Sequence, residues 1–489
     1  MIFNSPAFIF VFLPVTFLGW LFLIRQRLGF AAKIWLTIAS LVFYGWWNPL
    51  FLPLLLGSIW FNYRMGTMLM TRAGQPRGRR LLALAAGVNL IALGWFKYAN
   101  FIVDNLNAMT GMGLPSPDAI LPLGISFFTF TQIAWLVDSW RGEVRNRNAL
   151  DFTLFVTFFP HLIAGPILHH RQMMSQFASR WTQALRPSNV TRGLCLFSIG
   201  MFKKVVLADT FAIWSDAGFD GAGPLDFYAA WGCALSYTLQ LYFDFSGYCD
   251  MALGAALLFN IRLPINFDSP YKSLDIQEFW RRWHITLGAY LRDYVYIPLG
   301  GNRQGPVRVS MNLMATFLLG GLWHGASWMF IVWGALHGAA TVLHRTWKSL
   351  GGRLPAPVAW TLTFGFVVVA WVFFRARSWT AASRVLRGMG DLPSARSWPE
   401  ALLPTRDFAW AGPLLDPLLR VLPAQFVAMQ MCLVTVTLGM LVVSRRNSLQ
   451  LVDAYALSAR GIAAACLTFT VCALAMLGSR PSAFLYFNF

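Results

Sequence analysis

Long apolar runs recur along the whole chain, and short basic clusters separate them. A membrane-spanning helix needs about 20 mostly apolar residues. This chain is 57% hydrophobic and 12% charged, whereas soluble domains carry about 25% charged residues. The pattern predicts an all-α polytopic membrane protein with about 11–13 transmembrane helices in one domain, residues 1–489. The predicted spans are residues 7–24, 30–48, 50–63, 81–97, 119–138, 151–168, 190–214, 228–259, 311–333, 357–375, 424–443 and 461–478.

The basic residues indicate how the chain is oriented in the membrane. The formal net charge is +19, and Lys and Arg of polytopic proteins concentrate in cytoplasmic loops that face anionic lipid. Arg25 and Arg27 follow the first apolar run, and Arg445 and Arg446 precede the last one. Both termini are therefore expected in the periplasm. The chain shows no nucleic-acid-binding motif, so nucleic acid is not expected as a partner.

Three segments depart from the pattern of simple spans. Residues 262–310 are aromatic and basic and also carry acidic residues, which indicates re-entrant or interfacial helices. Residues 378–423 combine Pro and Leu with mixed charges, and we expect them to form the longest extramembrane loop. Residues 479–489 form an aromatic C-terminal tail.

Two histidines stand out within the apolar sequence. His324 lies in the segment GGLWHGASW, whose glycines allow another backbone or a ligand to approach closely. His284 follows Arg281, Arg282 and a tryptophan. On a helix, residues four apart are neighbours, so His284 would lie next to Trp280 and Arg282 would pair with Glu278. A neutral imidazole can act as a general base because its pKa lies near working pH. A hydrogen-bonded core histidine and an interfacial basic-aromatic belt are the alternatives.

Other chemistries lack their motifs. The chain has no HExxH sequence and no Cys/His cluster, so no metal site is expected. The six cysteines are scattered without a CxxC motif and are interpreted as small hydrophobic residues. No GxSxG motif supports a serine hydrolase. The intramembrane carboxylates Asp244 and Asp250 suit either a proton path or a hydrogen bond between helices.

Seven segments carry a more specific signal. They are LPLGISFFTFTQIAWLVDSWRG (121–142), FFPHLIAGPI (158–167), GMFKKVVLAD (200–209), YFDFSGYCDMALG (242–254), NFDSPYKS (266–273), FWRRWHITLGAYLRDYVYIPLGGNRQG (279–305) and GLWHGASWMFIVWGALHG (321–338). In this order they resemble the membrane-bound O-acyltransferase (MBOAT) family, in the bacterial branch of the alginate O-acetyltransferase membrane subunit. The departures are Trp135, where Tyr is common, and Cys249, where Ser is common.

The resemblance implies a bundle of helices around a central funnel, and acyl transfer with two catalytic positions, His324 and His284. Transfer from a thioester to a hydroxyl needs a base for the O–H proton and a group that polarises the carbonyl. We expect His324 to be the base and His284 to orient a substrate or stabilise developing charge. No bound cofactor is expected. The expected donor substrate is cytosolic acetyl-CoA, whose phosphates suit the basic residues Arg281, Arg282, Lys203 and Lys204.

The C-terminal sequence SAFLYFNF bears on the acceptor. It resembles an aromatic motif of bacterial polysaccharide-acylation systems, in which a tyrosine holds the acyl group for a periplasmic esterase-like acetyltransferase partner. Tyr486 is the relay candidate, because phenol is a better leaving group than an alkyl alcohol. An aromatic anchor at the membrane interface is the alternative.

The function implied is an inner-membrane O-acetyltransferase that serves an exported polysaccharide, with alginate favoured. Cellulose, another exopolysaccharide, peptidoglycan and teichoic acid are alternative acceptors. A proton-coupled transporter that uses His324 and Asp244, and a non-catalytic scaffold, are alternatives of other classes. The sequence shows no internal repeat, which argues against the transporter.

Overall fold

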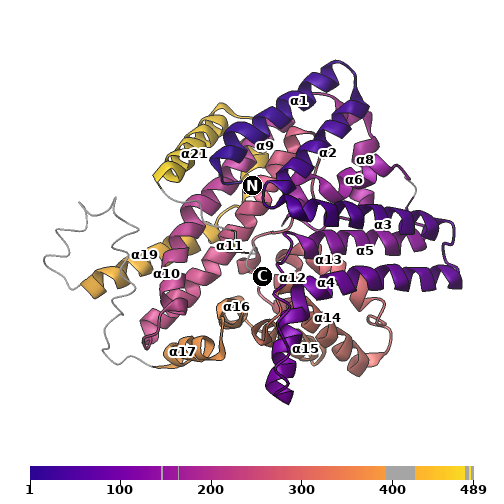
Figure 1. Cartoon of the computed structure of the whole chain (residues 1–489). Coiled ribbons are helices and arrows are strands. Elements are labelled where there is room, and N and C mark those ends of the chain that lie inside the picture. The colour runs from indigo at the N-terminus through magenta and orange to yellow at the C-terminus, as the bar shows by residue number, and fades with distance from the viewer. Residues whose placement is uncertain (145–146, 164, 392–423, 479–483, 486–489) are drawn as a thin grey trace.

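The structure is a computed structural model that describes residues 1–144, 147–163, 165–391, 424–478 and 484–485 (Figure 1). Its first half comprises η1 (Ala7–Phe12), α1 (Leu13–Arg25), α2 (Gly29–Gly45), η2 (Pro49–Phe51), α3 (Leu52–Met70), α4 (Pro76–Thr110), α5 (Ile125–Trp140), α6 (Ala149–Thr157), α7 (Phe159–Leu162), α8 (His170–Ala178), η3 (Arg180–Gln183), α9 (Pro187–Phe202), η4 (Lys203–Ala208) and α10 (Asp209–Asp220). The second half comprises α11 (Phe227–Leu258), η5 (Pro270–Lys272), α12 (Ile276–Arg282), α13 (Ile285–Leu291), η6 (Arg292–Tyr296), α14 (Gly305–His324), α15 (Trp328–Ser349), α16 (Ala356–Arg375), α17 (Trp379–Gly390), α19 (Ala424–Ser444), α20 (Ser448–Tyr455) and α21 (Ala459–Gly478). The predicted all-α class is confirmed.

The helix α11 forms the centre of the molecule. Almost all of its side chains are buried, and it contacts α9, α10, α16, α17 and α19 (Figure 1). Two glycines bring α9 and α11 close together: a Cβ on Gly247 would lie 2.7 Å from the carbonyl oxygen of Gly200. A larger side chain cannot fit at such a contact. The segments 200–209 and 242–254 therefore build the central helix contact.

Four described helices are long and apolar enough to cross a membrane. They are Ala7–Arg25, Pro76–Thr110, Ala356–Arg375 and Ala459–Met476, and Gly29–Gly45 and Gln430–Ser444 are shorter apolar helices. Length and hydropathy thus identify fewer spans than the about 11–13 that the sequence predicted. One reason is that central helices such as α11 are covered by protein and carry buried charged residues, which a hydropathy criterion penalises.

Two of the predicted spans are split, because the helix breaks within the apolar run. The run 311–333 contains α14 and α15, separated where Gly325 is extended and where the Ser327 side chain caps the N-terminus of α15. The run 151–168 contains α6, which ends before Pro160, and the single turn α7. The residue before a proline-containing turn cannot easily continue a helix.

Residues 262–310 form short helices instead of a span, as predicted. They comprise η5, α12, α13, η6 and the beginning of α14, and an isolated antiparallel bridge joins Phe267 to Trp283. The segment predicted as the longest loop contains a helix that was not predicted, α17, whose apolar side chains Ala382, Val385 and Met389 are buried. Its extramembrane location stays a prediction, and residues 392–423 lie outside the described residues.

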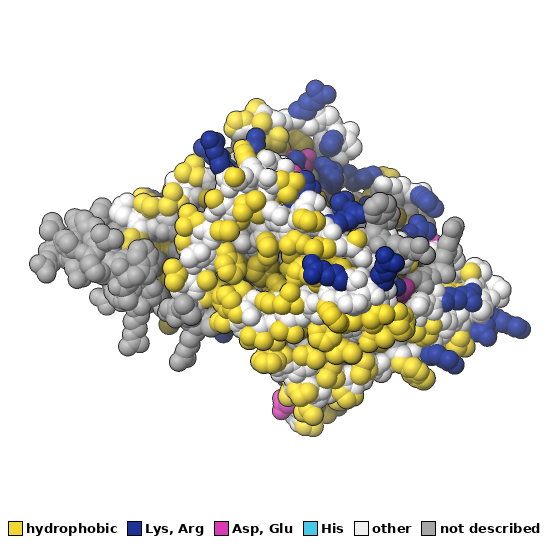
Figure 2. Space-filling view, turned by 90° about the horizontal axis from the view of Figure 1, so that it is seen from above, with side chains coloured by type: hydrophobic (Ala, Val, Ile, Leu, Met, Phe, Trp, Pro, Cys, Tyr) yellow, Lys and Arg dark blue, Asp and Glu magenta, His cyan; other side chains and the backbone are white. Residues whose placement is uncertain are grey.

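Basic residues gather at the end of the molecule where α3 joins α4 and where α5 ends. The Gly74 N–H donates to the carbonyl of Trp140 at 2.9 Å, which ties these two connections together. We call this the basic end; its residues are Arg72, Arg77, Arg79, Arg80 and Arg141. Figure 2 shows the molecule from above, with Lys and Arg side chains mainly in its right half and apolar side chains across its middle. The positive-inside rule assigns such an end to the cytoplasm.

Candidate active site

The fold brings His284 and His324 together. Their ring centroids lie 6.4 Å apart, and both side chains are buried, at 0% and 3% exposure. The ring of Trp323 packs against both, with its centroid 5.9 Å from that of His284 and 5.0 Å from that of His324. The two imidazoles therefore lie at one place in the fold. The sequence could not establish this proximity, because the two residues lie 40 positions apart in separate segments of the chain.

His284 lies between helices and not on one. The helix α12 ends at Arg282, and His284 has a left-handed backbone, with φ 45° and ψ 52°, at the N-terminus of α13. The expected helical neighbourhood of Trp280 and His284 is therefore wrong. The residues on either side pair with the segment 266–268, since the Asp268 N–H donates to Arg282 O and the Ile285 N–H to Asn266 O, both at 3.0 Å. A non-glycine residue in this conformation is strained and is typical of a functional site.

Asn266 fixes the orientation and the tautomer of His284. Its Oδ1 accepts from the backbone N–H of Thr286 at 3.2 Å and from the Thr286 hydroxyl at 3.0 Å, and it lies 3.1 Å from His284 Nδ1. Since a backbone N–H can only donate, this atom of Asn266 is the amide oxygen, and His284 Nδ1 must carry the proton. The lone pair of the neutral ring is therefore on Nε2.

His324 is the last residue of α14, and aromatic rings enclose it. The rings of Trp333 and Phe374 both lie 5.0 Å from the imidazole centroid. Gly321 allows α15 to approach this helix end, because a Cβ there would lie 2.3 Å from the carbonyl oxygen of Phe330. The close backbone approach expected around His324 is thus confirmed.

Two cavities reach His324. The larger has a volume of about 560 Å³ and mostly apolar walls from α12, α13, α14 and α15; we call it the large cavity. Arg281 and Arg292 also line it. The second, the small cavity, has a volume of about 130 Å³ and is lined by residues of α4, by 121–127 and by Trp47. Lys97, which the sequence analysis did not single out, lies in the small cavity together with His324.

The cavities lie toward different ends of the molecule. Arg292 of the large cavity precedes Asp293, whose carbonyl accepts from Arg141 at the basic end, at 3.3 Å. Arg77 of the basic end and Lys97 of the small cavity both lie on α4. At about 1.5 Å per residue, the helix between them is roughly 30 Å long. That length matches the hydrocarbon thickness of a bilayer. His324 thus lies between a cavity at the basic end and one remote from it.

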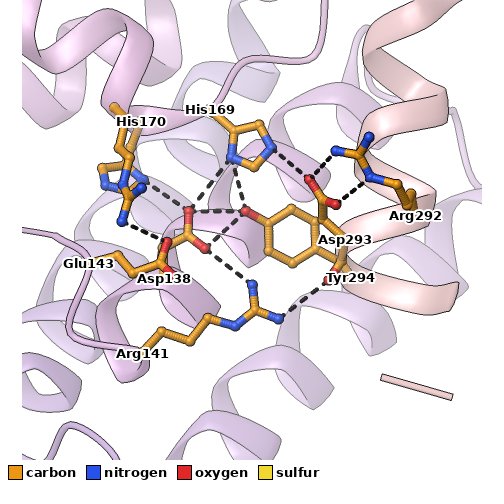
Figure 3. Close-up of polar contacts among 9 residues, drawn as sticks. Asp138, Arg141, Glu143, His169, His170, Arg292, Asp293 and Tyr294 are labelled. Carbon is orange, nitrogen blue, oxygen red and sulfur yellow. Dashed lines mark hydrogen bonds and ion pairs between the residues drawn. The ribbon is translucent and has the colours of Figure 1, made fainter. Parts of the chain in front are cut away.

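A polar network connects the large cavity to α5 at the basic end (Figure 3). Asp138 accepts from the Tyr294 hydroxyl at 3.0 Å and lies 2.9 Å from His170 Nδ1, while Tyr294 also lies 3.2 Å from His169 Nδ1. Burial, together with the Asp138 carboxylate, raises the pKa of Tyr294, so its hydroxyl stays protonated and donates. This network anchors η6, and with it Arg292.

Of the four basic residues expected to bind the donor, only Arg281 lines a cavity with His324. Lys203 forms an ion pair with Asp250 at 2.7 Å, and Lys204 forms one with Asp244 at 2.7 Å. Arg282 pairs with Glu278 at 2.9 Å, as helical spacing predicted. Asp244 and Asp250 therefore hold helices together through ion pairs.

The C-terminal tail reaches the neighbourhood of His284. Phe484 is buried and stacks on Tyr248 with a centroid distance of 4.6 Å, and it lies 5.7 Å from Phe245. Phe245 in turn contacts His284, with ring centroids 4.8 Å apart. The Leu485 N–H donates to Asp244 at 3.0 Å. Tyr486, the relay candidate, lies outside the described residues.

The remaining buried histidines have partners of their own. His337 accepts from the Trp280 indole N–H at 3.2 Å, and His161 Nε2 lies 2.9 Å from the carbonyl oxygen of Phe155. Within the described ranges, no three His, Cys, Asp or Glu residues lie together as a metal site requires. Of these buried histidines, His324 lines both cavities, and His284 lies beside it.

Known proteins resemble this chain along its length. The model of the membrane-bound O-acyltransferase family matches residues 93–378. The chain is 43% identical to a peptidoglycan O-acetyltransferase of Helicobacter pylori, over 100% of this chain and 98% of that protein. It is 45% identical to a probable alginate O-acetylase of Pseudomonas putida, over 80% of each chain. A teichoic acid D-alanyltransferase of Streptococcus thermophilus is 28% identical, over 52% of this chain and 68% of that one.

The matched region contains both histidines, the large cavity and most of the small one. A family model that covers more than half of the chain agrees with relatives that cover most or all of it. The chain therefore belongs to the membrane-bound O-acyltransferase family, and it is a multi-pass membrane O-acetyltransferase.

Proposed function

We propose that the protein transfers acetyl groups from a cytosolic thioester, acetyl-CoA, through the bacterial inner membrane to an exported polysaccharide. The observation that carries the proposal is the position of His324, which lines both cavities and lies 6.4 Å from His284. A donor from one end and an acceptor from the other would meet at this residue.

In this proposal His324 is the general base. It takes the proton of the acceptor hydroxyl while the oxygen attacks the thioester carbonyl, and the proton then leaves with the thiol when the C–S bond breaks. His284, held with its proton on Nδ1 by Asn266, keeps the lone pair of Nε2 free to accept a hydrogen bond from a reactant and so to orient it. The aromatic walls around His324 exclude water, which would otherwise hydrolyse the thioester.

The large cavity is the proposed donor site. It lies toward the basic end, which the positive-inside rule assigns to the cytoplasm. Arg281 and Arg292 supply positive charge for the phosphates of the donor, and the apolar walls suit its acyl arm. Arg292 also pairs with Asp293 at 2.7 Å, which orients its guanidinium group. Lys203, Lys204 and Arg282 line neither cavity with His324, so we assign them a smaller part in donor binding than their charge alone suggested.

The C-terminal tail is the proposed acyl carrier. Phe484 packs on Phe245, which packs on His284, and Asp244 holds the backbone of Leu485, the residue that precedes Tyr486 in the sequence. A phenolic acetyl ester formed there would pass to a periplasmic esterase-like partner. With both termini in the periplasm, as the flanking arginines predict, the carrier would lie on the side of the partner.

The acceptor polymer is proposed from the relatives. Their names include alginate and peptidoglycan, and the relative named for peptidoglycan covers the whole chain. Alginate, the polymer favoured from the sequence, therefore has peptidoglycan as an equal candidate. O-acetyl content of both polymers, measured in cells that lack the protein and in complemented cells, decides between them.

The test of the chemistry is His324→Ala in purified membranes supplied with radiolabelled acetyl-CoA. We expect transfer to fall by a factor of about 100 or more, since a positioned base contributes about 10²–10⁴-fold. His161→Ala is the matched control, because it removes a buried histidine that lines neither cavity. Unchanged transfer by the His324 variant would refute the proposed base. In parallel, Tyr486→Phe should abolish acetylation of the polymer while insertion continues, and full acetylation would refute the carrier.

A further inference from the structure

Lys97 is a charged residue within the long apolar helix α4. It lies in one of the four helices that can cross a membrane by length and hydropathy. An ionisable side chain at membrane depth is costly, and it usually has a partner that explains its presence. In the described part of the chain, no carboxylate lies within ion-pair distance of Lys97, in contrast to Lys33, Lys203 and Lys204.

The partners of Lys97 are the last carbonyl groups of α14. Its Nζ donates to the carbonyl oxygens of Trp323 and His324, the latter at 3.3 Å, and also lies 3.3 Å from the Ser126 hydroxyl. The next residue, Tyr98, donates its hydroxyl to the carbonyl of Leu322 at 2.7 Å. Two consecutive residues of α4 thus bond three consecutive carbonyls at the end of α14.

This arrangement solves a problem that the helix break creates. The last carbonyls of a helix have no partner within it, and no water of the bilayer core can replace one. Because Gly325 is extended, α14 does not close on itself in the usual left-handed cap. The positive charge of the Lys97 ammonium group also interacts favourably with the negative C-terminal end of the α14 dipole.

We propose that Lys97 and Tyr98 are positioning residues for acyl transfer, which cap α14 from another helix and so hold His324 where the two cavities meet. The inference rests on the proposed role of His324 as the base. Lys97 acts through the backbone of α14 and not on the substrate. A small shift of that helix end would move the imidazole away from the reacting atoms.

The experiment compares Lys97→Met, Lys97→Arg and Tyr98→Phe in full-length protein reconstituted in vesicles, with thiol release from acetyl-CoA as the readout. Lys97→Met should lower kcat per folded molecule by about 30-fold with KM for the donor within about threefold, since a misplacement of about 1 Å can cost 10²-fold. Lys97→Arg keeps a charged donor and should retain kcat within about fivefold. Tyr98→Phe, which removes one neutral hydrogen bond, should lower kcat by about 3–10-fold.

Lys33→Met is the matched control, because it removes a lysine from the apolar helix α2 that is paired with Asp151 and lines neither cavity with His324. It should lower the folded yield without changing kcat per folded molecule. Hydrogen exchange of residues 322–328 should increase in Lys97→Met and not in Lys33→Met. A wild-type kcat in Lys97→Met would overturn the inference, as would a loss of kcat in Lys97→Arg equal to that in Lys97→Met. His324→Ala is assayed alongside: if it loses activity while Lys97→Met does not, the base is retained and only the positioning role of Lys97 is refuted.

Discussion

Asn266→Ala is the substitution that tests most directly how the site is organised. The amide oxygen of Asn266 accepts from His284 Nδ1–H and from two donors of Thr286, at 3.0–3.2 Å, and all three residues are buried. Alanine has no side-chain atom that can accept these hydrogen bonds. The variant removes the acceptor from His284 and from the Thr286 N–H, whereas the Thr286 hydroxyl can rotate.

The expected magnitudes differ for stability and for catalysis. A buried donor that loses its acceptor costs about 1–3 kcal/mol, so two donors lower the free energy of unfolding by about 2–6 kcal/mol. The orientation of His284 depends on one hydrogen bond, with a net value of about 0.5–1.5 kcal/mol. At about 1.36 kcal/mol per tenfold change, kcat should fall by about 2- to 13-fold.

The assay measures kcat per folded molecule, with the folded fraction taken from size-exclusion chromatography after heating in detergent. Asn89→Ala is the matched control, because Asn89 is a buried asparagine bonded to Asn62 and Ala85 and contacts neither histidine. Both variants should melt earlier, and only Asn266→Ala should lose kcat. Equal kcat in the two variants would refute the idea that Asn266 sets the tautomer and orientation of His284.

Three further substitutions test separate parts of the structure. Arg292→Gln should raise KM for acetyl-CoA by about 3–10-fold, less so at high salt, with kcat unchanged; an unchanged KM would remove this arginine from donor binding. Gly321→Ala places a Cβ 2.3 Å from the carbonyl oxygen of Phe330 and should lower the free energy of unfolding by about 1–3 kcal/mol, visible as an earlier melting transition. Lys204→Met leaves Asp244 buried without its cation and should lower the free energy of unfolding by about 3–5 kcal/mol. Because Asp244 also accepts from the Leu485 N–H, proteolysis of the C-terminal tail should be faster in this variant, and an unchanged cleavage rate would argue against this anchor.

Local patterns in the sequence predicted local structure well. Helical spacing predicted the pair of Glu278 and Arg282, which lie 2.9 Å apart on α12. The glycines beside His324 predicted close backbone packing, and Gly321 provides it. Both inferences need only the geometry of one helix and its nearest neighbour.

The same patterns failed where the helix breaks or where a distant partner decides. His284 is not on the helix of Trp280, because α12 ends at Arg282 and the chain turns to pair with Asn266. Positive charge marked Lys203 as a phosphate ligand, but its carboxylate partner lies on α11. The sequence did not predict a role for Lys97, because a single lysine in an apolar run does not indicate which helix end it caps. Sequence spacing holds no information on such contacts.

The broken helices themselves explain why the site lies where it does. His324 ends α14, and His284 begins α13, so both imidazoles are attached at helix termini. A helix terminus exposes polar backbone groups that hydrocarbon cannot satisfy, and it is tolerated in a membrane only within protein or beside a cavity. The bonds from Lys97 and from Asn266 meet this need with side chains from elsewhere in the chain. The same bonds that make the breaks tolerable therefore fix the two imidazoles relative to each other, so stability and catalytic geometry depend on the same contacts.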